Sequence, residues 1–332
     1  MRRGLFIAAA IAFGLLLGGG AAELMLRLSG RQPWQTLQAR QNEPVMHDPD
    51  PRLGWKPIPG HHVVAPYSPG GPSPHFTFLA DGTRTTGARG DRDKVVFVGC
   101  SFTQGWAVSD EDTFAWRIQQ ERPELAVFNY GVTAYGTYQS LLLLERLFAE
   151  PDPPRVVFYG LLEEHEQRNV ADMNWLLPLA LLSKGGIVET PYCTLGNNGD
   201  LVRHEPEGYP HWPLREHSAL ITELQNQYAS VAGGPRAAAA RPVTERLLLE
   251  MRRLVEQHGS RFCVVLLHLS PDTKAHYVEF LAEHQVDFVD CAFPLTPDMR
   301  VRGDHHPNGT MHARYAECIA AKMRAAGWVG PH

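Results

Sequence analysis

The sequence of 332 residues has little cysteine and no excess of positive charge. Its five cysteines include no Cys-x-x-Cys pair, which argues against a zinc ribbon, a thioredoxin-type site and a disulfide-dense scaffold. The net charge is -5 and no basic stripe occurs, so nucleic acid is not an expected partner. No Gly-x-Gly-x-x-Gly or phosphate-loop pattern follows a predicted strand, and no cofactor is expected. The composition instead indicates a globular chain of one large domain or two modest ones.

The N-terminal segment has the composition of a membrane helix. Arg2 and Arg3 precede an uncharged apolar run of 18 residues, 5–22, which is at the short end of what spans a bilayer. Basic residues ahead of such a run keep the N-terminus in the cytoplasm and send the rest of the chain outside. A signal peptide cleaved after Ala22 is the alternative. The helical pattern continues to Gly30, so an uncleaved anchor over 1–30 is preferred.

Beyond Lys94, predicted strands alternate with predicted helices. The strands cover 95–98, 125–130, 155–161, 261–267 and 286–290, and the helices cover 112–121, 137–150, 243–258, 271–284 and 308–326. This alternation predicts a parallel five-stranded sheet with helices on both faces. Ser109 and Asp112 form a plausible capping box for the first of these helices.

Two parts of the chain break this rhythm. Residues 31–93 are rich in Pro, Gly and His, and they predict an irregular lead-in with one short strand at 75–80. Residues 171–235 predict an insertion in the main domain, 31–332, that Gly233-Gly234-Pro235 closes. Cys263 and Cys291 each lie in a predicted strand, so a bridge between them is possible but cannot be inferred from the sequence.

The stretch 94–104 carries a candidate nucleophile. The β-branched apolar run 95–98 is typical of a strand buried on both faces, and Gly99 ends it. Ser101 follows at the carboxyl edge of the predicted sheet, where α/β proteins bind their ligands. A serine there can act as a nucleophile when a base reaches it. An ordinary strand-to-loop turn that contains serine is the alternative.

A second polar segment, 303–308, follows the fifth predicted strand and precedes the last helix. A serine hydroxyl needs an imidazole to take its proton, and the imidazole needs a carboxylate to orient it and stabilise its charge. His306 is the candidate base and Asp304 the candidate carboxylate, since their loop lies at the same sheet edge as Ser101. The N–H groups of Ser101 and of Gly131, after the second strand, are candidate oxyanion donors. A simple turn glycine is the alternative for Gly131.

Three blocks in this order resemble the SGNH/GDSL hydrolase superfamily. Gly99-Cys100-Ser101-Phe102 is similar to its Gly-Asp-Ser block, Asn129-Tyr130-Gly131 to its glycine block, and Asp304-His305-His306-Pro307-Asn308 to its acid–base block. The resemblance covers about 94–169 and 261–325. It implies a flavodoxin-like three-layer α/β/α sandwich that hydrolyses or transfers O-acyl esters.

The anchored N-terminus and the segment Gly54-Trp55-Lys56-Pro57 resemble bacterial members associated with cell-surface polysaccharides. That resemblance implies a single-pass protein of the bacterial inner membrane whose catalytic domain faces the periplasm or another extracytoplasmic space. It also implies an acylated carbohydrate, most simply an acetyl ester, as the substrate.

The chain departs from the family pattern in two blocks. The family places its aspartate three residues before the histidine, where this chain has Gly303, so Asp304 serves only in a tighter loop. The family's Gly-x-Asn-Asp block corresponds to Leu162-Glu163-Glu164-His165, which lacks the asparagine that would donate to the oxyanion. Asn169 is the candidate replacement, and His165 is another.

Two other functions remain open. A metal-dependent hydrolase would gather imidazoles and carboxylates around one ion, and the candidate ligands are His165, Asp304, His305, His306 and His312. No regular ligand spacing supports that site, and no metal is expected. A non-catalytic polysaccharide-binding or assembly protein on the same fold is the third possibility. Trp106, Trp116, Trp175 and His268 are candidate substrate contacts, although packing is the usual role of such aromatic side chains.

Overall fold

The computed structural model describes residues 2–35, 46–182 and 188–328. The chain divides into two compact units. One unit comprises residues 1–39, 172–189 and 207–237, and the other comprises 40–171, 190–206 and 238–332. The larger unit contains the sheet and every candidate catalytic residue.

The larger unit is built on a five-stranded sheet of order β11-β10-β7-β5-β6, all parallel. Its strands are β5 (Lys94–Gly99), β6 (Ala126–Gly131), β7 (Val156–Leu162), β10 (Arg261–His268) and β11 (Phe288–Asp290). Counted along the chain this order is 2-1-3-4-5, the flavodoxin-like arrangement. The predicted five-stranded parallel sheet is therefore confirmed.

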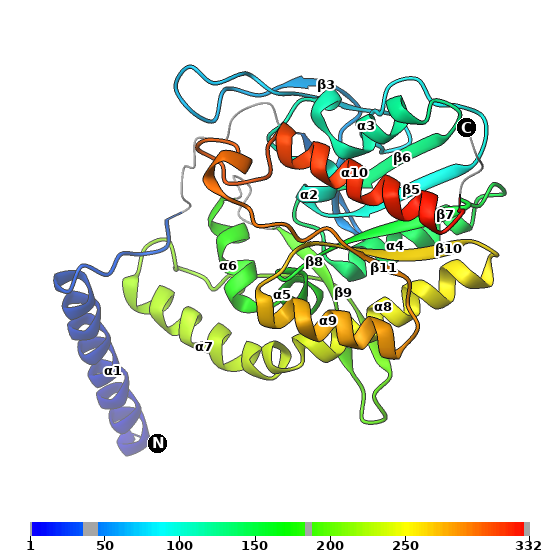
Figure 1. Cartoon of the computed structure of the whole chain (residues 1–332). Helices are drawn as coiled ribbons and strands as arrows, with labels where there is room; N and C mark the ends of the chain where they lie inside the picture. The colour runs from blue at the N-terminus through cyan, green and yellow to red at the C-terminus, as the bar shows by residue number, and fades with distance from the viewer. Residues whose placement is uncertain (1, 36–45, 183–187, 329–332) are drawn as a thin grey trace. The chain divides into compact units, whose positions relative to one another are not determined.

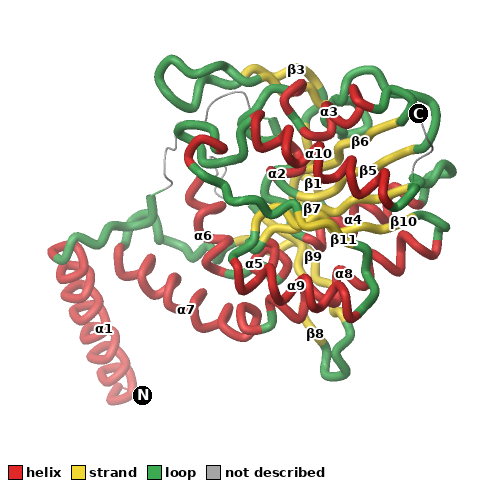
Figure 2. Tube along the Cα trace, in the orientation of Figure 1, coloured by secondary structure: helices red, strands yellow, loops and turns green. Residues whose placement is uncertain are grey.

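Helices cover both faces of this sheet (Figures 1 and 2). On one face the apolar stripes of α4 (Thr137–Phe148), α8 (Ala240–Gln257) and α9 (Pro271–Glu283) pack against alternate strand residues. On the other face α3 (Phe114–Glu121) and α10 (Gly309–Ala325) do the same. The strands are apolar on both sides because both sides are covered.

Shorter elements surround the carboxyl edge of the sheet. These are α2 (Ser101–Gln104), α5 (His165–Asn169) and the 3-10 turns η1 (Asp110–Asp112) and η2 (Pro297–Met299). The predicted capping box is wrong: α3 begins after Thr113, whose hydroxyl accepts a hydrogen bond from the Trp116 N–H at 3.2 Å. The residues between Ser109 and Thr113 form η1 instead.

The lead-in is more regular than its composition predicts. It forms two antiparallel pairs, β1 (His47–Asp50) with β2 (Gly54–Pro57) and β3 (Gly60–Val63) with β4 (His75–Phe78). Only the last of these strands was expected. The other three contain glycine, proline or histidine, which individually indicate turns, and their pairing depends on contacts that local propensity does not encode.

The segment predicted as an insertion forms α6 (Met173–Leu182), β8 (Glu189–Leu195), β9 (Leu201–Gly208) and α7 (Ala219–Ala238). Gly233-Gly234-Pro235, which was predicted to close this segment, lies inside the last part of α7, close to residue 237 where the compact unit ends. A Cβ at Gly233 would stand 2.7 Å from the Met173 side chain, so this glycine permits a close contact with α6. The helix α1 (Arg2–Leu28) belongs to the same compact unit as α6 and α7, whereas β8 and β9 lie mostly in the larger unit. Helix α1 has the length and hydropathy of a membrane span.

A fully buried arginine fixes the loop that follows α2. Arg84 donates to the Asp110 carboxylate at 2.8 Å. It also donates to the carbonyl oxygens of Gln104, Gly105, Val108 and His75, at 3.1, 2.5, 2.7 and 3.0 Å. A buried guanidinium with all these acceptors joins the lead-in to the loop 104–110.

We expect Arg84→Met to lower the free energy of unfolding by about 3–5 kcal/mol, because it leaves the Asp110 carboxylate buried and unpaired. Arg253→Met is the matched control, since Arg253 is half-exposed and its ion pair with Glu250 should contribute less than about 1 kcal/mol. Urea unfolding of the full chain in mild detergent measures both. Equal losses in the two variants would contradict the role given to Arg84.

Candidate active site

Ser101 is positioned by the close packing of α2 on the sheet edge. Thr103 presses against the ends of β5 and β7, where a Cβ at Gly99 or at Gly160 would stand only 2.3 Å from the Thr103 Oγ1. The two glycines therefore let α2 settle directly on the strands. Ser101 opens this helix and is 4% exposed, with its hydroxyl at the carboxyl edge of the sheet.

The structure brings the three candidate catalytic side chains together. The Ser101 Oγ lies 3.0 Å from the His306 Nε2, and the His306 Nδ1 lies 2.5 Å from the Asp304 Oδ1. The His306 backbone N–H also donates to the same carboxylate oxygen, at 3.2 Å. The order hydroxyl, imidazole, carboxylate is the order that proton transfer from the serine requires. Their catalytic roles remain a prediction.

The short Asp-x-His spacing depends on an unusual backbone turn. His305, between the two, has φ of +77°, in the left-handed region that non-glycine residues rarely adopt. Its N–H donates to the Val301 carbonyl at 3.2 Å, and the Val301 N–H donates to the His306 carbonyl at 2.8 Å. This turn folds Asp304 under the imidazole within one residue fewer than the family pattern uses. The tighter loop that Asp304 needs is present.

Asp304 is held as a carboxylate by its hydrogen bonds. Burial raises the pKa of the Asp304 carboxyl, but the hydrogen bonds from His306 and Trp106 outweigh burial and hold this pKa below its usual value. The Trp106 indole N–H donates to the Asp304 Oδ2 at 3.2 Å, the oxygen that His306 does not use. A carboxylate with one oxygen fixed by Trp106 presents the other to His306 in a defined orientation.

The lead-in supports Trp106 from behind. The Trp106 ring centroid lies 5.5 Å from that of Phe76 in β4 and 6.4 Å from that of Tyr67. Gly303 packs on the backbone of Tyr67, where a Cβ would stand 2.2 Å from the Tyr67 carbonyl oxygen. The lead-in is therefore part of the scaffold that holds Asp304.

Two of the three predicted oxyanion donors, Gly131 and Asn169, hydrogen-bond other groups of the protein. The Gly131 N–H donates to the Asn129 Oδ1 at 3.0 Å, and a Cβ at Gly131 would lie 2.3 Å from the Gln104 N. The glycine thus serves the close approach of β6 to α2. The Asn169 amide donates to the hydroxyls of Thr137 and Thr244, at 2.9 and 2.8 Å. Neither the Gly131 N–H nor the Asn169 amide is free to bind an oxyanion in this arrangement.

Sequence reasoning missed Ala134, in the loop after β6. Ala134 has φ of +69°. Within residues 2–35, 46–182 and 188–328, neither its N–H nor the Ser101 N–H donates a hydrogen bond. The hydroxyl of the preceding Thr133 hydrogen-bonds the Gln104 side chain, which holds this loop against α2. In the sequence, only the nearby block Asn129-Tyr130-Gly131 could have drawn attention to Ala134, because an alanine does not by itself indicate a positive φ.

The remaining candidates fall into three places. His268 stacks on Phe102 with centroids 5.5 Å apart, and Phe102 contacts His306 at 5.6 Å, so His268 lies one ring away from the base. Trp116 packs beside Gly87, in the lead-in. Trp175 belongs to the other compact unit.

Beyond the contact between Asp304 and His306, the residues proposed as metal ligands do not gather around one point in the described part of the chain. His165 is fully buried, and its Nδ1 lies 2.6 Å from the Tyr159 hydroxyl, while the His312 Nδ1 accepts from the Phe114 N–H at 3.4 Å. Across residues 2–35, 46–182 and 188–328, no group of three or more His, Cys, Asp or Glu side chains could hold a metal ion.

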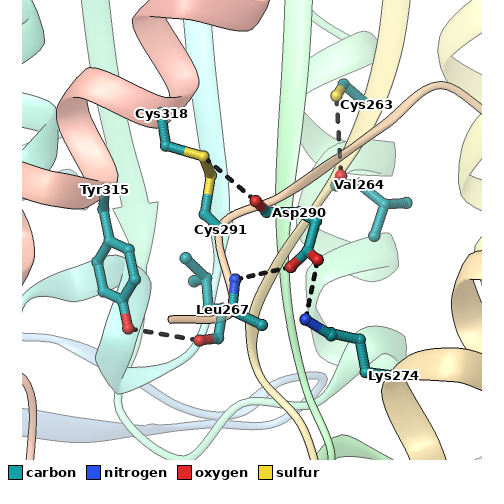
Figure 3. Close-up of a disulfide and its surroundings, with 9 residues drawn as sticks. Cys263, Val264, Leu267, Lys274, Asp290, Cys291, Tyr315 and Cys318 are labelled. Atoms are coloured by element: carbon teal, nitrogen blue, oxygen red, sulfur yellow. Dashed lines mark hydrogen bonds and ion pairs between the residues drawn. A yellow bond between two sulfur atoms is a disulfide. The ribbon is translucent and has the colours of Figure 1, made fainter. Parts of the chain in front are cut away.

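One disulfide closes the segment that carries Asp304 and His306. Cys291 pairs with Cys318 of α10, whereas Cys263 is buried and free, so a bridge between Cys263 and Cys291 does not form (Figure 3). Close by, the Asp290 carboxylate accepts from the Ala292 N–H at 3.0 Å and from Lys274 at 2.9 Å. Cys318 lies in the predicted helix 308–326, and only cysteines in predicted strands were considered as a pair, so its bridge to Cys291 was missed.

No protein-family model matches the chain, and no curated protein matches its sequence. Solved structures similar to it include a lipolytic protein of the G-D-S-L family from Veillonella parvula, at 11% identity and a TM-score of 0.42, covering 69% of this chain and 97% of that chain. A psychrotrophic esterase, EstA, from a Pseudoalteromonas species is 10% identical with a TM-score of 0.36, over 70% of this chain and 100% of that chain. AlinE4, an SGNH-hydrolase family esterase, is 13% identical with a TM-score of 0.36, over 73% and 99%.

Position 305 tests the short turn. We expect His305→Gly to keep the free energy of unfolding near that of the unmodified chain, since glycine adopts positive φ freely. His305→Val should lower it by about 1–2 kcal/mol, because a β-branched residue strains the turn. Arg302→Val is the matched control, exposed in the same loop but without positive φ. Urea unfolding measures all three variants, and equal losses in the two valine variants would refute the strained turn.

The disulfide gives a separate prediction. Cys318→Ser should lower the free energy of unfolding by about 3–4 kcal/mol, because the bridge closes a loop of 27 residues. Dithiothreitol should bring the urea midpoint of the unmodified chain down to that of the variant and leave the variant unchanged. A midpoint of the unmodified chain that ignores the reductant would argue that the bridge does not form.

Proposed function

We propose that this chain is a serine esterase or O-acyltransferase that acts on O-acyl esters, most simply acetyl esters, of a carbohydrate or cell-surface polysaccharide. The observation that carries the proposal is the hydrogen-bonded order of Ser101, His306 and Asp304 at the carboxyl edge of a parallel sheet. Three groups from segments about 200 residues apart, in the order that acyl transfer needs, are rarely a packing accident.

The proposed reaction has two halves. As the Ser101 hydroxyl attacks the ester carbonyl, the His306 Nε2 takes its proton, and the ionised Asp304 stabilises the imidazolium. The imidazolium then protonates the leaving alkoxide, which departs as the alcohol and leaves an acyl–serine ester. Water, or a second sugar hydroxyl, gives its proton to His306 as its oxygen attacks the acyl carbonyl. The bond between the acyl carbon and the Ser101 oxygen then breaks, His306 returns the proton to that oxygen, and the acid or the new ester leaves.

The developing oxyanion needs hydrogen-bond donors in fixed positions. The Ser101 N–H is one proposed donor, and we assign the second to the Ala134 N–H in place of Gly131 and Asn169. The free N–H of Ala134, its positive φ and its loop held against α2 support this assignment. Backbone donors also suit a chain that has Glu164 where the family has an asparagine.

The proposed location is the outer side of a bacterial inner membrane, with α1 as a single-pass anchor. The long apolar helix at the N-terminus supports it, although a signal sequence would look the same. A disulfide between Cys291 and Cys318 also fits an oxidising, extracytoplasmic compartment. The half-buried Trp106 ring beside the base suits a sugar ring as part of the substrate.

Substitution of the nucleophile tests the proposal directly. Ser101→Ala should lower kcat for p-nitrophenyl acetate by about 10³-fold or more, since removing a triad member removes the covalent route. A fluorophosphonate probe should label the unmodified chain at Ser101 and fail to label the variant. Ser109→Ala, in the next loop, is the control and should keep both activity and labelling.

Other outcomes separate the alternatives. Activity that survives Ser101→Ala but is lost to a chelator would identify a metal-dependent hydrolase. A correctly folded chain that neither reacts with the probe nor hydrolyses acetyl esters would identify a non-catalytic polysaccharide-binding protein. The ratio of free acetate to acetylated polysaccharide, when both water and acceptor are present, distinguishes hydrolysis from transfer.

A further inference from the structure

The outer face of α7 carries apolar side chains and no exposed charge. Leu224, Tyr228 and Val231 are 45%, 54% and 79% exposed, and their i, i+4, i+7 spacing puts them on one side of the helix. From 224 to 237 the other exposed positions are Gln, Ser, Ala, Gly or Pro. One fifth of the whole chain is charged, so an uncharged stripe of this length is unusual for a helix that faces water.

The end of α1 is tied to the start of α7. The Glu23 carboxylate accepts from the Ser218 hydroxyl at 2.8 Å and from the backbone N–H groups of Ala219 and Leu220 at 3.0 and 2.8 Å. The Arg27 guanidinium donates to the His217 carbonyl at 2.8 Å. The Glu23 carboxylate caps the first turn of α7, and the Arg27 guanidinium binds a carbonyl beside it. Together they fix the end of α1 against the start of α7.

The chain just after α1 strengthens the joint. The Trp34 N–H donates to the Arg215 carbonyl and lies within hydrogen-bonding distance of the Thr222 hydroxyl, each at 2.9 Å. The Trp34 ring stacks on Tyr209. The Arg215 guanidinium carbon lies over the Trp34 ring, 4.2 Å from the ring centroid. The residues on both sides of the α1 terminus therefore contact the same few residues before and within α7.

The length of the apolar run sets the level of this joint in a bilayer. Residues 5–22 are uncharged and, as a helix rising about 1.5 Å per residue, span about 27 Å, close to the thickness of a hydrocarbon core. Glu23 then stands at the outer boundary of the hydrocarbon. Because Glu23 caps α7, the first turn of α7 stands at the bilayer surface.

We propose that α7 lies on the bilayer that α1 crosses, with Leu224, Tyr228 and Val231 at the boundary between headgroups and acyl chains. The occupant of this face is a phospholipid surface. The Trp212 ring, 5.5 Å from that of Tyr228, belongs to the same surface, and such amphipathic rings favour the headgroup level. The contact gives the anchored unit a second attachment and restrains its rotation about the single helix.

A polarity probe at residue 231 tests this contact. The full chain with Val231→Cys, labelled with the fluorophore NBD, is reconstituted in vesicles of phosphatidylethanolamine and phosphatidylglycerol. The free cysteines at 100, 193 and 263 are buried, which favours labelling at the new thiol. Ser230→Cys, on an exposed position of the same helix about 100° round from Val231, is the matched control.

We expect nitroxide-bearing lipids to quench NBD at position 231 at least threefold more than at position 230. Adding Tyr228→Glu should reduce that quenching, because a carboxylate resists burial at the interface. Equal quenching at the two positions overturns the proposal. So does a probe at 231 that is shielded from aqueous iodide but not quenched by lipid, since another protein or a second copy then covers the face. A membrane-bound chain whose N-terminal residue lies after Ala22 overturns it as well.

Discussion

The guanidinium of Arg84 is the constraint on which the candidate active site depends. It is fully buried, and it ties the loop 104–110 to the lead-in through one carboxylate and four carbonyl oxygens. That loop carries Trp106, whose indole N–H orients Asp304, which in turn orients His306. A buried ion is costly unless every donor finds an acceptor, so the arrangement is specific as well as stable. The lead-in is therefore a structural part of the site.

The site is assembled from segments that close packing brings to one sheet edge. Glycines at the ends of β5 and β7 let α2 sit on the strands, which fixes the nucleophile. The opposite side of the site lies in a loop that the Cys291–Cys318 bridge closes and that the Asn308 cap ends at the start of α10. Within this loop, the positive φ of His305 shortens the path from carboxylate to imidazole. Each of these features fixes where a candidate catalytic side chain lies rather than changing its chemical character.

Periodicity and strand-end residues were enough to predict the sheet, the helices on both its faces, and the meeting of Ser101 with His306. These features follow from local patterns that repeat along the chain. The pairing of Cys291 with Cys318, the strands β1 to β3 and the course of α7 through Pro235 depend on contacts between distant residues, which no local pattern encodes. The partners of the predicted oxyanion donors also depend on distant contacts. Gly131 and Asn169 lie where the sequence blocks suggested, but Gly131 donates to Asn129 and Asn169 donates to Thr137 and Thr244.

The proton between His306 and Asp304 offers the most direct test of the account. An imidazole N–H that donates to a carboxylate resonates far downfield in proton nuclear magnetic resonance. The full chain in detergent micelles should show such a resonance that disappears in Asp304→Asn and in His306→Gln, and persists in His268→Gln and in His276→Gln, which removes another histidine–carboxylate pair. A resonance that survives Asp304→Asn, or none assignable to His306, would contradict the hydrogen-bonded order proposed for the site.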